Sequence, residues 1–97
     1  MIHGISEKVI DQIKHLAQKY DVDRVVLFGS RARGDHYRTS DIDLATWGGN
    51  YALFAIDVDD ETDTLLKYDI INMLGNVNKE LVDQISKEGI CIYEKVQ

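Results

Sequence analysis

Two aspartates that alternate with apolar residues are the first feature of this sequence that could carry chemistry. Asp41 and Asp43 lie in the run SDIDLAT, separated by Ile42. Because successive side chains of a strand point to opposite faces, the two carboxylates would share one face while Ile42 and Leu44 face the core. Carboxylates this close repel each other unless a cation lies between them, and hard oxygen ligands suit Mg²⁺. A lone Asp-x-Asp is also typical of a solvated strand face, so the pair alone leaves both interpretations open.

A Gly-Ser pair upstream could bind an anion. Gly29 and Ser30 follow the apolar run VVLF, which is typical of a strand covered on both faces. Glycine permits a tight turn and the close approach of a ligand, and serine adds a hydroxyl donor beside the amides of a helix start. The pair therefore suggests a small phosphate cradle. A turn in which Ser30 only caps the helix is the more common alternative.

A third acidic residue, Asp69, lies in an otherwise apolar strand predicted over residues 67–73. Aspartate is disfavoured inside strands, so its presence calls for a reason. It could complete a metal site on the neighbouring strand or take a proton from an attacking hydroxyl; a solvent-facing edge position is the alternative. Only its strand context distinguishes it from four aspartates shortly upstream, namely Asp57, Asp59, Asp60 and Asp63.

The hydropathy pattern predicts an α/β (α+β) domain that would position these residues. Helices are predicted over 5–20 with Ser6 as the N-cap, from about 31 to a stop at Gly34, over 51–63 and over 78–88. Strands are predicted over 24–28, 40–46, 67–73 and 90–93, the last at an edge. We expect one domain over residues 1–97, a small mixed β-sheet with flanking helices in two or three layers.

The composition restricts the partners and the compartment. The chain has 97 residues, 17 of them acidic and 11 basic, and a formal net charge of −6. This balance argues against binding to bulk nucleic-acid backbone or to an anionic membrane. No apolar run approaches the roughly 20 residues of a spanning helix. The single cysteine, Cys91, excludes an internal disulfide and a cysteine zinc site. We expect a cytoplasmic protein in which Cys91 packs as a small apolar residue.

Taken together, the motifs resemble those of a known superfamily. The run GSRARGDHYRTSDIDL over residues 29–44 has a Gly-Ser, a spacer of ten residues and an Asp-x-Asp. It resembles the nucleotidyltransferase superfamily of the DNA polymerase beta type, and most closely its minimal nucleotidyltransferase (MNT) branch. The wider resemblance extends from the first helix to the ending EGICIYEK over residues 88–95. It implies a fold like the palm of polymerase beta.

The resemblance also implies a role for each site residue. Gly29 and Ser30 would hold the β- and γ-phosphates of ATP. Two Mg²⁺ ions would be bound by Asp41 and Asp43, with Asp69 completing the catalytic and metal site and helping to activate the incoming hydroxyl. The nucleotide-binding set would also include Arg31 and Arg33, although both arginines could instead be solvated charges on a polar loop.

The resemblance further implies a partner. Minimal members of the superfamily often act with a small helical HEPN-domain protein in a toxin–antitoxin system, in which the transferase neutralises an RNase toxin by moving AMP from ATP to a tyrosine. We expect this activity. Two alternatives are a non-catalytic module that neutralises a HEPN partner by binding it, and a small-molecule nucleotidyltransferase of the aminoglycoside-modifying type.

Overall fold

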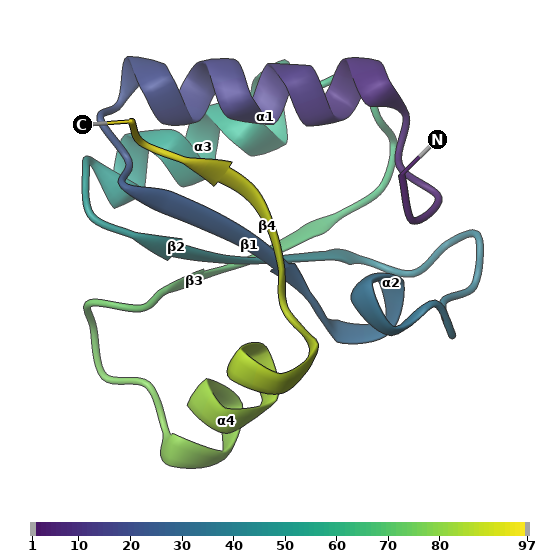
Figure 1. The fold of residues 1–97 in the computed structure, drawn as a ribbon. Helices are drawn as coiled ribbons and strands as arrows, with labels where there is room; N and C mark the ends of the chain where they lie inside the picture. Colours follow the sequence, from purple (N-terminus) through teal and green to yellow (C-terminus); the bar gives the residue numbers. More distant parts are fainter. Residues whose placement is uncertain (1, 97) are drawn as a thin grey trace.

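A four-stranded mixed sheet in the order β3-β2-β1-β4 is the centre of the molecule; the computed structural model describes residues 2–96. The elements are α1 (Glu7–Lys19), β1 (Arg24–Phe28), α2 (Gly29–Arg33), β2 (Ile42–Trp47), α3 (Tyr51–Glu61), β3 (Tyr68–Asn72), α4 (Lys79–Glu88) and β4 (Ile90–Glu94). Strand β1 pairs antiparallel with both β2 and β4, whereas β2 and β3 are parallel. Figure 1 shows α1 and α3 over one face of the sheet, α4 below the other and α2 at one end. The predicted mixed sheet with flanking helices is confirmed, with three layers.

The first helix packs along the sheet as its apolar spacing predicts. Ser6 is the N-cap, and its hydroxyl accepts a hydrogen bond from the amide of Val9 at 3.2 Å. This bond satisfies one of the free amides of the first turn. Residues Ile13 and Ala17, four positions apart, are fully buried against the sheet. The predicted N-cap is thus confirmed, and the helix begins two residues later than predicted.

Two apolar clusters cover the two faces of the sheet. The larger one lies under α1 and α3 and includes Leu27, Leu44 and Phe54. The smaller one lies under α4, where Ile85 packs with Val26, Phe28 and Ala45. Strand β1 is buried from its second residue onward, as predicted for a strand covered on both faces.

The boundaries of two elements differ from the prediction in ways that matter for the site. Helix α2 begins at Gly29 itself, and Gly34 ends it in the left-handed conformation with φ +88°. Strand β2 begins at Ile42, so Asp41 lies immediately before the strand. The stop at Gly34 and the edge position of β4 are confirmed.

The prediction that Cys91 packs as a small apolar residue is wrong. Cys91 is exposed, because β4 is an edge strand and this position faces outward. Among residues 2–96, no helix combines the length and the hydrophobicity that crossing a bilayer requires.

A pair of substitutions on α3 tests the core. Phe54 is completely buried, whereas Leu53 is 45% exposed. We expect Phe54→Ala to lower the free energy of unfolding by about 3–5 kcal/mol, because it removes a large buried side chain and leaves a cavity. The matched change Leu53→Ala should have an effect below about 1 kcal/mol. Urea denaturation followed by circular dichroism measures both, and similar losses would contradict the packing described.

Candidate functional site

The register of the sheet brings two of the predicted aspartates side by side. Asp43 pairs with Phe28 on β1 and with Asp69 on β3. Register partners in neighbouring strands point to the same face, so the carboxylates of Asp43 and Asp69 project on the same side of the sheet. The sequence singled out Asp69 only by its strand context, and the parallel β2–β3 pairing now supplies an independent reason for that choice.

The four aspartates on and just after α3, which the sequence left as alternatives to Asp69, lie away from this site. Asp57 accepts a hydrogen bond from the hydroxyl of Tyr20. Asp63 forms an ion pair with Lys8 at 2.6 Å. Two more, Asp59 and Asp60, are exposed on α3. Asp59, Asp60 and Asp63 thus lie on an exposed acidic surface, as predicted, whereas Asp57 is partly buried.

The Gly29 backbone lies directly against the Asp43 carboxylate. Gly29 is buried with φ +76°, and a Cβ atom built on it would collide with the side chain of Asp43. Both the backbone conformation and the close contact therefore require glycine here. The N-cap position of α2 is Phe28, so the interpretation of Ser30 as a cap is wrong. Among the described residues the Ser30 hydroxyl has no hydrogen-bond partner, which leaves it available to a ligand.

The electrostatics of the site are dominated by unpaired negative charge. Burial of the carboxyl, reinforced by the charges of Asp69 and Asp41, raises the pKa of Asp43 from 3.8 to about 6. Arg33 opposes this shift and Glu88 adds to it. Within residues 2–96, the hydrogen bonds and ion pairs leave the carboxylates of Asp41, Asp43 and Asp69 without a partner. A cation placed among them would relieve this repulsion.

These carboxylates suit a divalent cation in their chemistry. Asp41 and Asp69 are exposed and Asp43 is half-buried, so all three can reach a solvated ion. Across the described part of the chain, no three His, Cys, Asp or Glu side chains already stand close enough to enclose a metal. The three aspartates supply hard oxygen ligands at one end of strands β2 and β3, although as they stand they do not enclose an ion.

The expectation that Arg31 is an exposed charge is wrong. Its side chain is buried, with an exposed fraction of 1%. The guanidinium donates to the carbonyl oxygens of Ser40 at 2.8 and 3.0 Å, His3 at 3.2 Å and Arg38 at 3.3 Å. These bonds tie α2 to the N-terminal segment and to the loop that leads into Asp41. Because the donors of Arg31 are used inside the fold, we do not assign it to the nucleotide.

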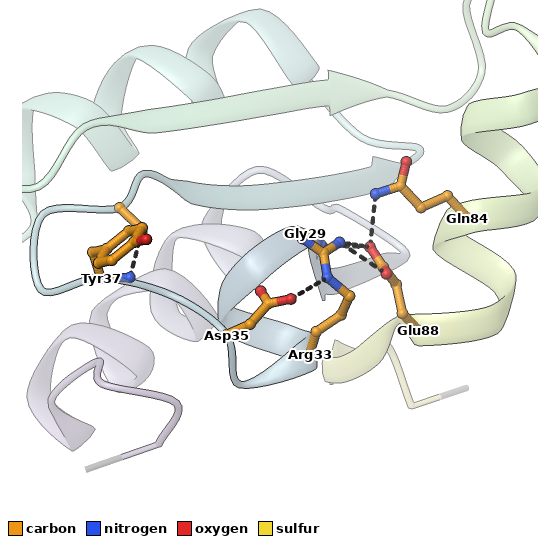
Figure 2. Close-up of polar contacts among 7 residues, drawn as sticks. Gly29, Arg33, Asp35, Tyr37, Gln84 and Glu88 are labelled. Carbon is orange, nitrogen blue, oxygen red and sulfur yellow. Dashed lines mark hydrogen bonds and ion pairs between the residues drawn. The ribbon is translucent and has the colours of Figure 1, made fainter.

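Arg33 is exposed and remains a candidate ligand for phosphate. Its Nε donates to Asp35 at 3.1 Å, and its Nη1 donates to both carboxylate oxygens of Glu88 at 3.1 and 3.0 Å. Figure 2 shows Glu88 reaching from α4 to this arginine and to Gly29, whose amide donates a hydrogen bond to the Glu88 carboxylate at 2.9 Å. Sequence reasoning did not identify Glu88 as part of the site. Its only signal was its place at the start of EGICIYEK, residues 88–95.

Comparison with known proteins agrees with this geometry. Residues 11–97 match the family model described as "Polymerase beta, Nucleotidyltransferase". No curated protein matches the sequence.

Solved structures show the same fold. The chain aligns with "Crystal structure of the toxin-antitoxin with AMP-PNP" at a TM-score of 0.72 and 19% identity, over 89% of this chain and 73% of the other. It also aligns with a crystal structure of a mutant of the toxin–antitoxin MntA-HpeT at a TM-score of 0.68 and 17% identity, with the same coverage. At these identities the likeness concerns the fold, and it confirms the predicted palm-like architecture.

A pair of arginine substitutions separates the structural residue from the exposed one. We expect Arg31→Lys to lower the free energy of unfolding by about 2–3 kcal/mol, because one ammonium group cannot replace a buried guanidinium that donates to three carbonyls. The matched change Arg33→Lys on the same helix should change stability little. Urea denaturation measures both. Equal stability of the two variants would show that Arg31 does not hold the loop before Asp41.

Asp43 should make the metal-free protein less stable as the pH rises. Its pKa in the folded state is about 6 and its ordinary value is 3.8, so the native state binds more protons between these values. Stability contributed by the protonated form is therefore present below pH 4 and is lost as the pH rises through 6. We expect Asp43→Asn to raise the free energy of unfolding at pH 7 by about 1 kcal/mol, a value reduced for solvent screening of a half-exposed group.

Thermal unfolding in a chelating buffer between pH 4 and 7 measures this effect. Asp83→Asn, which removes an exposed charge from α4, is the matched control and should keep the wild-type pH dependence. If Asp43→Asn follows the wild-type curve at every pH, the repulsion described above is absent.

Proposed function

This chain belongs to the polymerase beta nucleotidyltransferase family, and from that premise we propose that it is a Mg²⁺-dependent enzyme that transfers AMP from ATP to a protein hydroxyl. The observation that carries the proposal is the pairing of Asp43 with Asp69, together with the contact of Gly29 with Asp43. This arrangement puts three features at one end of the sheet: the Gly29 backbone, which a ligand can approach closely, a free serine hydroxyl and a set of unpaired carboxylates. Phosphoryl transfer needs these groups, since its catalysis consists mainly of positioning and charge stabilisation.

The triphosphate would bind at the start of α2. The Gly29 amide and the Ser30 hydroxyl would donate to the β- and γ-phosphates. Arg33, exposed on the same helix, would add a guanidinium. A guanidinium matches the geometry of phosphate oxygens and stays charged at every relevant pH.

The carboxylates would organise the reaction itself. Asp41 and Asp43 would hold two Mg²⁺ ions, with Asp69 completing the set. Bound there, the ions would neutralise the charge of the triphosphate and of the leaving group. Asp69 would also accept the proton of the incoming hydroxyl, whose oxygen forms a bond to the α-phosphorus. The bond from that phosphorus to the bridging oxygen breaks, and pyrophosphate leaves.

We propose a helical HEPN-domain toxin as the acceptor, with a tyrosine as the modified residue. The sequence resemblance to minimal nucleotidyltransferases supports this choice. The fold likeness to structures of toxin–antitoxin complexes, one of them with AMP-PNP, is consistent with it. The protein would then act as the antitoxin in the cytoplasm.

A label-transfer assay tests this proposal. The protein is mixed with Mg²⁺, ATP labelled at the α-phosphate and the helical product of a neighbouring gene. We expect label on the partner, and we expect Asp43→Asn to reduce its rate of appearance by at least about 100-fold, because the substitution removes a metal ligand. Asp60→Asn, an equal charge change on the exposed side of α3, should leave the rate unchanged.

Two outcomes would overturn the proposal. Neutralisation of the toxin that survives Asp43→Asn, without any transfer of label, would identify a binding module. Label that accumulates on a small molecule while the partner stays unlabelled would identify a small-molecule transferase.

A further inference from the structure

The carboxylate of Glu88 occupies donors in the proposed phosphate site. Glu88 is the last residue of α4, and its side chain is only 15% exposed. Oε1 accepts hydrogen bonds from the Gly29 amide at 2.9 Å, from Arg33 at 3.1 Å and from Gln84 at 2.8 Å. Oε2 accepts a second bond from Arg33 at 3.0 Å. Figure 2 shows the carboxylate between α2 and α4, facing both of the α2 donors.

Two of these three donors are groups that the proposed function gives to the triphosphate. A backbone amide has one hydrogen, and it cannot donate fully to Glu88 and to a phosphate oxygen together. The Arg33 guanidinium has further donors, but its Nη1 is directed at the carboxylate and its Nε at Asp35. A carboxylate presents two anionic oxygens, as the edge of a phosphate does, so Glu88 satisfies these donors as a phosphate would.

The charge of Glu88 reaches the rest of the site as well. It contributes to the raised pKa of Asp43, which places it within electrostatic range of the aspartates. Burial of the Glu88 carboxyl favours its neutral form, but the hydrogen bonds from Gln84, Arg33 and Gly29 outweigh this effect and lower its pKa. The group is therefore ionised at neutral pH. A bound triphosphate would be repelled by this charge.

The backbone around Glu88 is fixed, so the side chain is the part that can move. The Gly89 amide donates to the carbonyl of Ile85 at 2.8 Å, and a Cβ at Gly89 would collide with that same carbonyl. Ile85 itself is buried in the cluster under α4. Moving the end of α4 would break these contacts, whereas rotating the Glu88 side chain breaks only the hydrogen bonds of its carboxylate.

We propose that Glu88 is an internal competitor for nucleotide phosphate. In the free protein its carboxylate occupies the Gly29 amide and the Arg33 guanidinium, and binding of the nucleotide exchanges this carboxylate for a phosphate oxygen. The inference rests on the proposed function, and it concerns the regulation of the same site. Glu88 would thus weaken nucleotide binding, because its carboxylate occupies donors of the nucleotide site itself.

Calorimetric titration with AMP-PNP at saturating Mg²⁺ tests the inference. We expect Glu88→Gln to bind about three- to tenfold more tightly than wild type, because the side chain keeps its shape but loses the competing charge. Glu88→Ala, which removes both oxygens, should bind at least as tightly as Glu88→Gln. Glu80→Gln is the matched control, since it removes an exposed charge from the same helix, and it should bind within about twofold of wild type.

A double-mutant cycle tests whether Arg33 is one of the donors for which Glu88 and the nucleotide phosphate compete. In an Arg33→Gln background, the gain from Glu88→Gln should shrink, because one of the two contested donors is already gone. A gain of full size in that background would overturn the role given to Arg33. Thermal unfolding of each variant confirms that the comparison concerns folded protein.

Failure of the inference and failure of the proposed function give different results. If wild type binds AMP-PNP and transfers label but Glu88→Gln binds equally or more weakly, the competitor role is wrong and the proposed function stands. If neither wild type nor any Glu88 variant binds AMP-PNP, nucleotide binding at this site is wrong, and the inference fails with it. Tighter binding by both Glu88 variants, with Glu80→Gln unchanged, supports the inference.

Discussion

The contact between the Gly29 backbone and the Asp43 carboxylate links the fold of this protein to its chemistry. It joins the end of β1 and the start of α2 to the middle strand β2, and it leaves no room for a side chain at residue 29. The proposed phosphate site and the proposed metal site are therefore adjacent because the Gly29 backbone meets the Asp43 side chain there. The parallel pairing of β2 with β3 then adds Asp69 beside Asp43. A shift of one residue in either register would turn a carboxylate to the opposite face of the sheet, which the larger cluster under α1 and α3 covers.

The two arginines of α2, Arg31 and Arg33, have different roles because one is buried and the other is exposed. Arg31 is enclosed and bonds to three carbonyls, so it fixes the loop that delivers Asp41 to the site. Arg33, two residues later on the same short helix, points outward and bonds to carboxylates. Two positions on one short helix thus carry different roles, because Arg31 holds the backbone in place and Arg33 has partners that can be exchanged.

The sequence was sufficient where the information was local. The alternation of Ile42 and Leu44 with the aspartates predicted the face on which Asp43 lies, and Gly34 correctly marked the end of the short helix. The burial of Arg31 could not be predicted in this way, because it depends on carbonyls brought together from the N-terminal segment and the loop before β2. Glu88 was missed for the same reason: its partner Gly29 is distant in sequence, and only the packing of α4 across the sheet brings the two together.

Helix α4 buries fewer residues than any of the other three helices. Of its ten residues only Ile85 is buried, and it covers a small cluster that is separate from the main core. Opening this helix would therefore expose fewer buried side chains than opening α1 or α3. The residue that occupies the phosphate donors is thus carried by a helix that contributes one buried residue to the core. A partner protein bound to α4 could therefore change the affinity for nucleotide without contacting either the nucleotide or the aspartates.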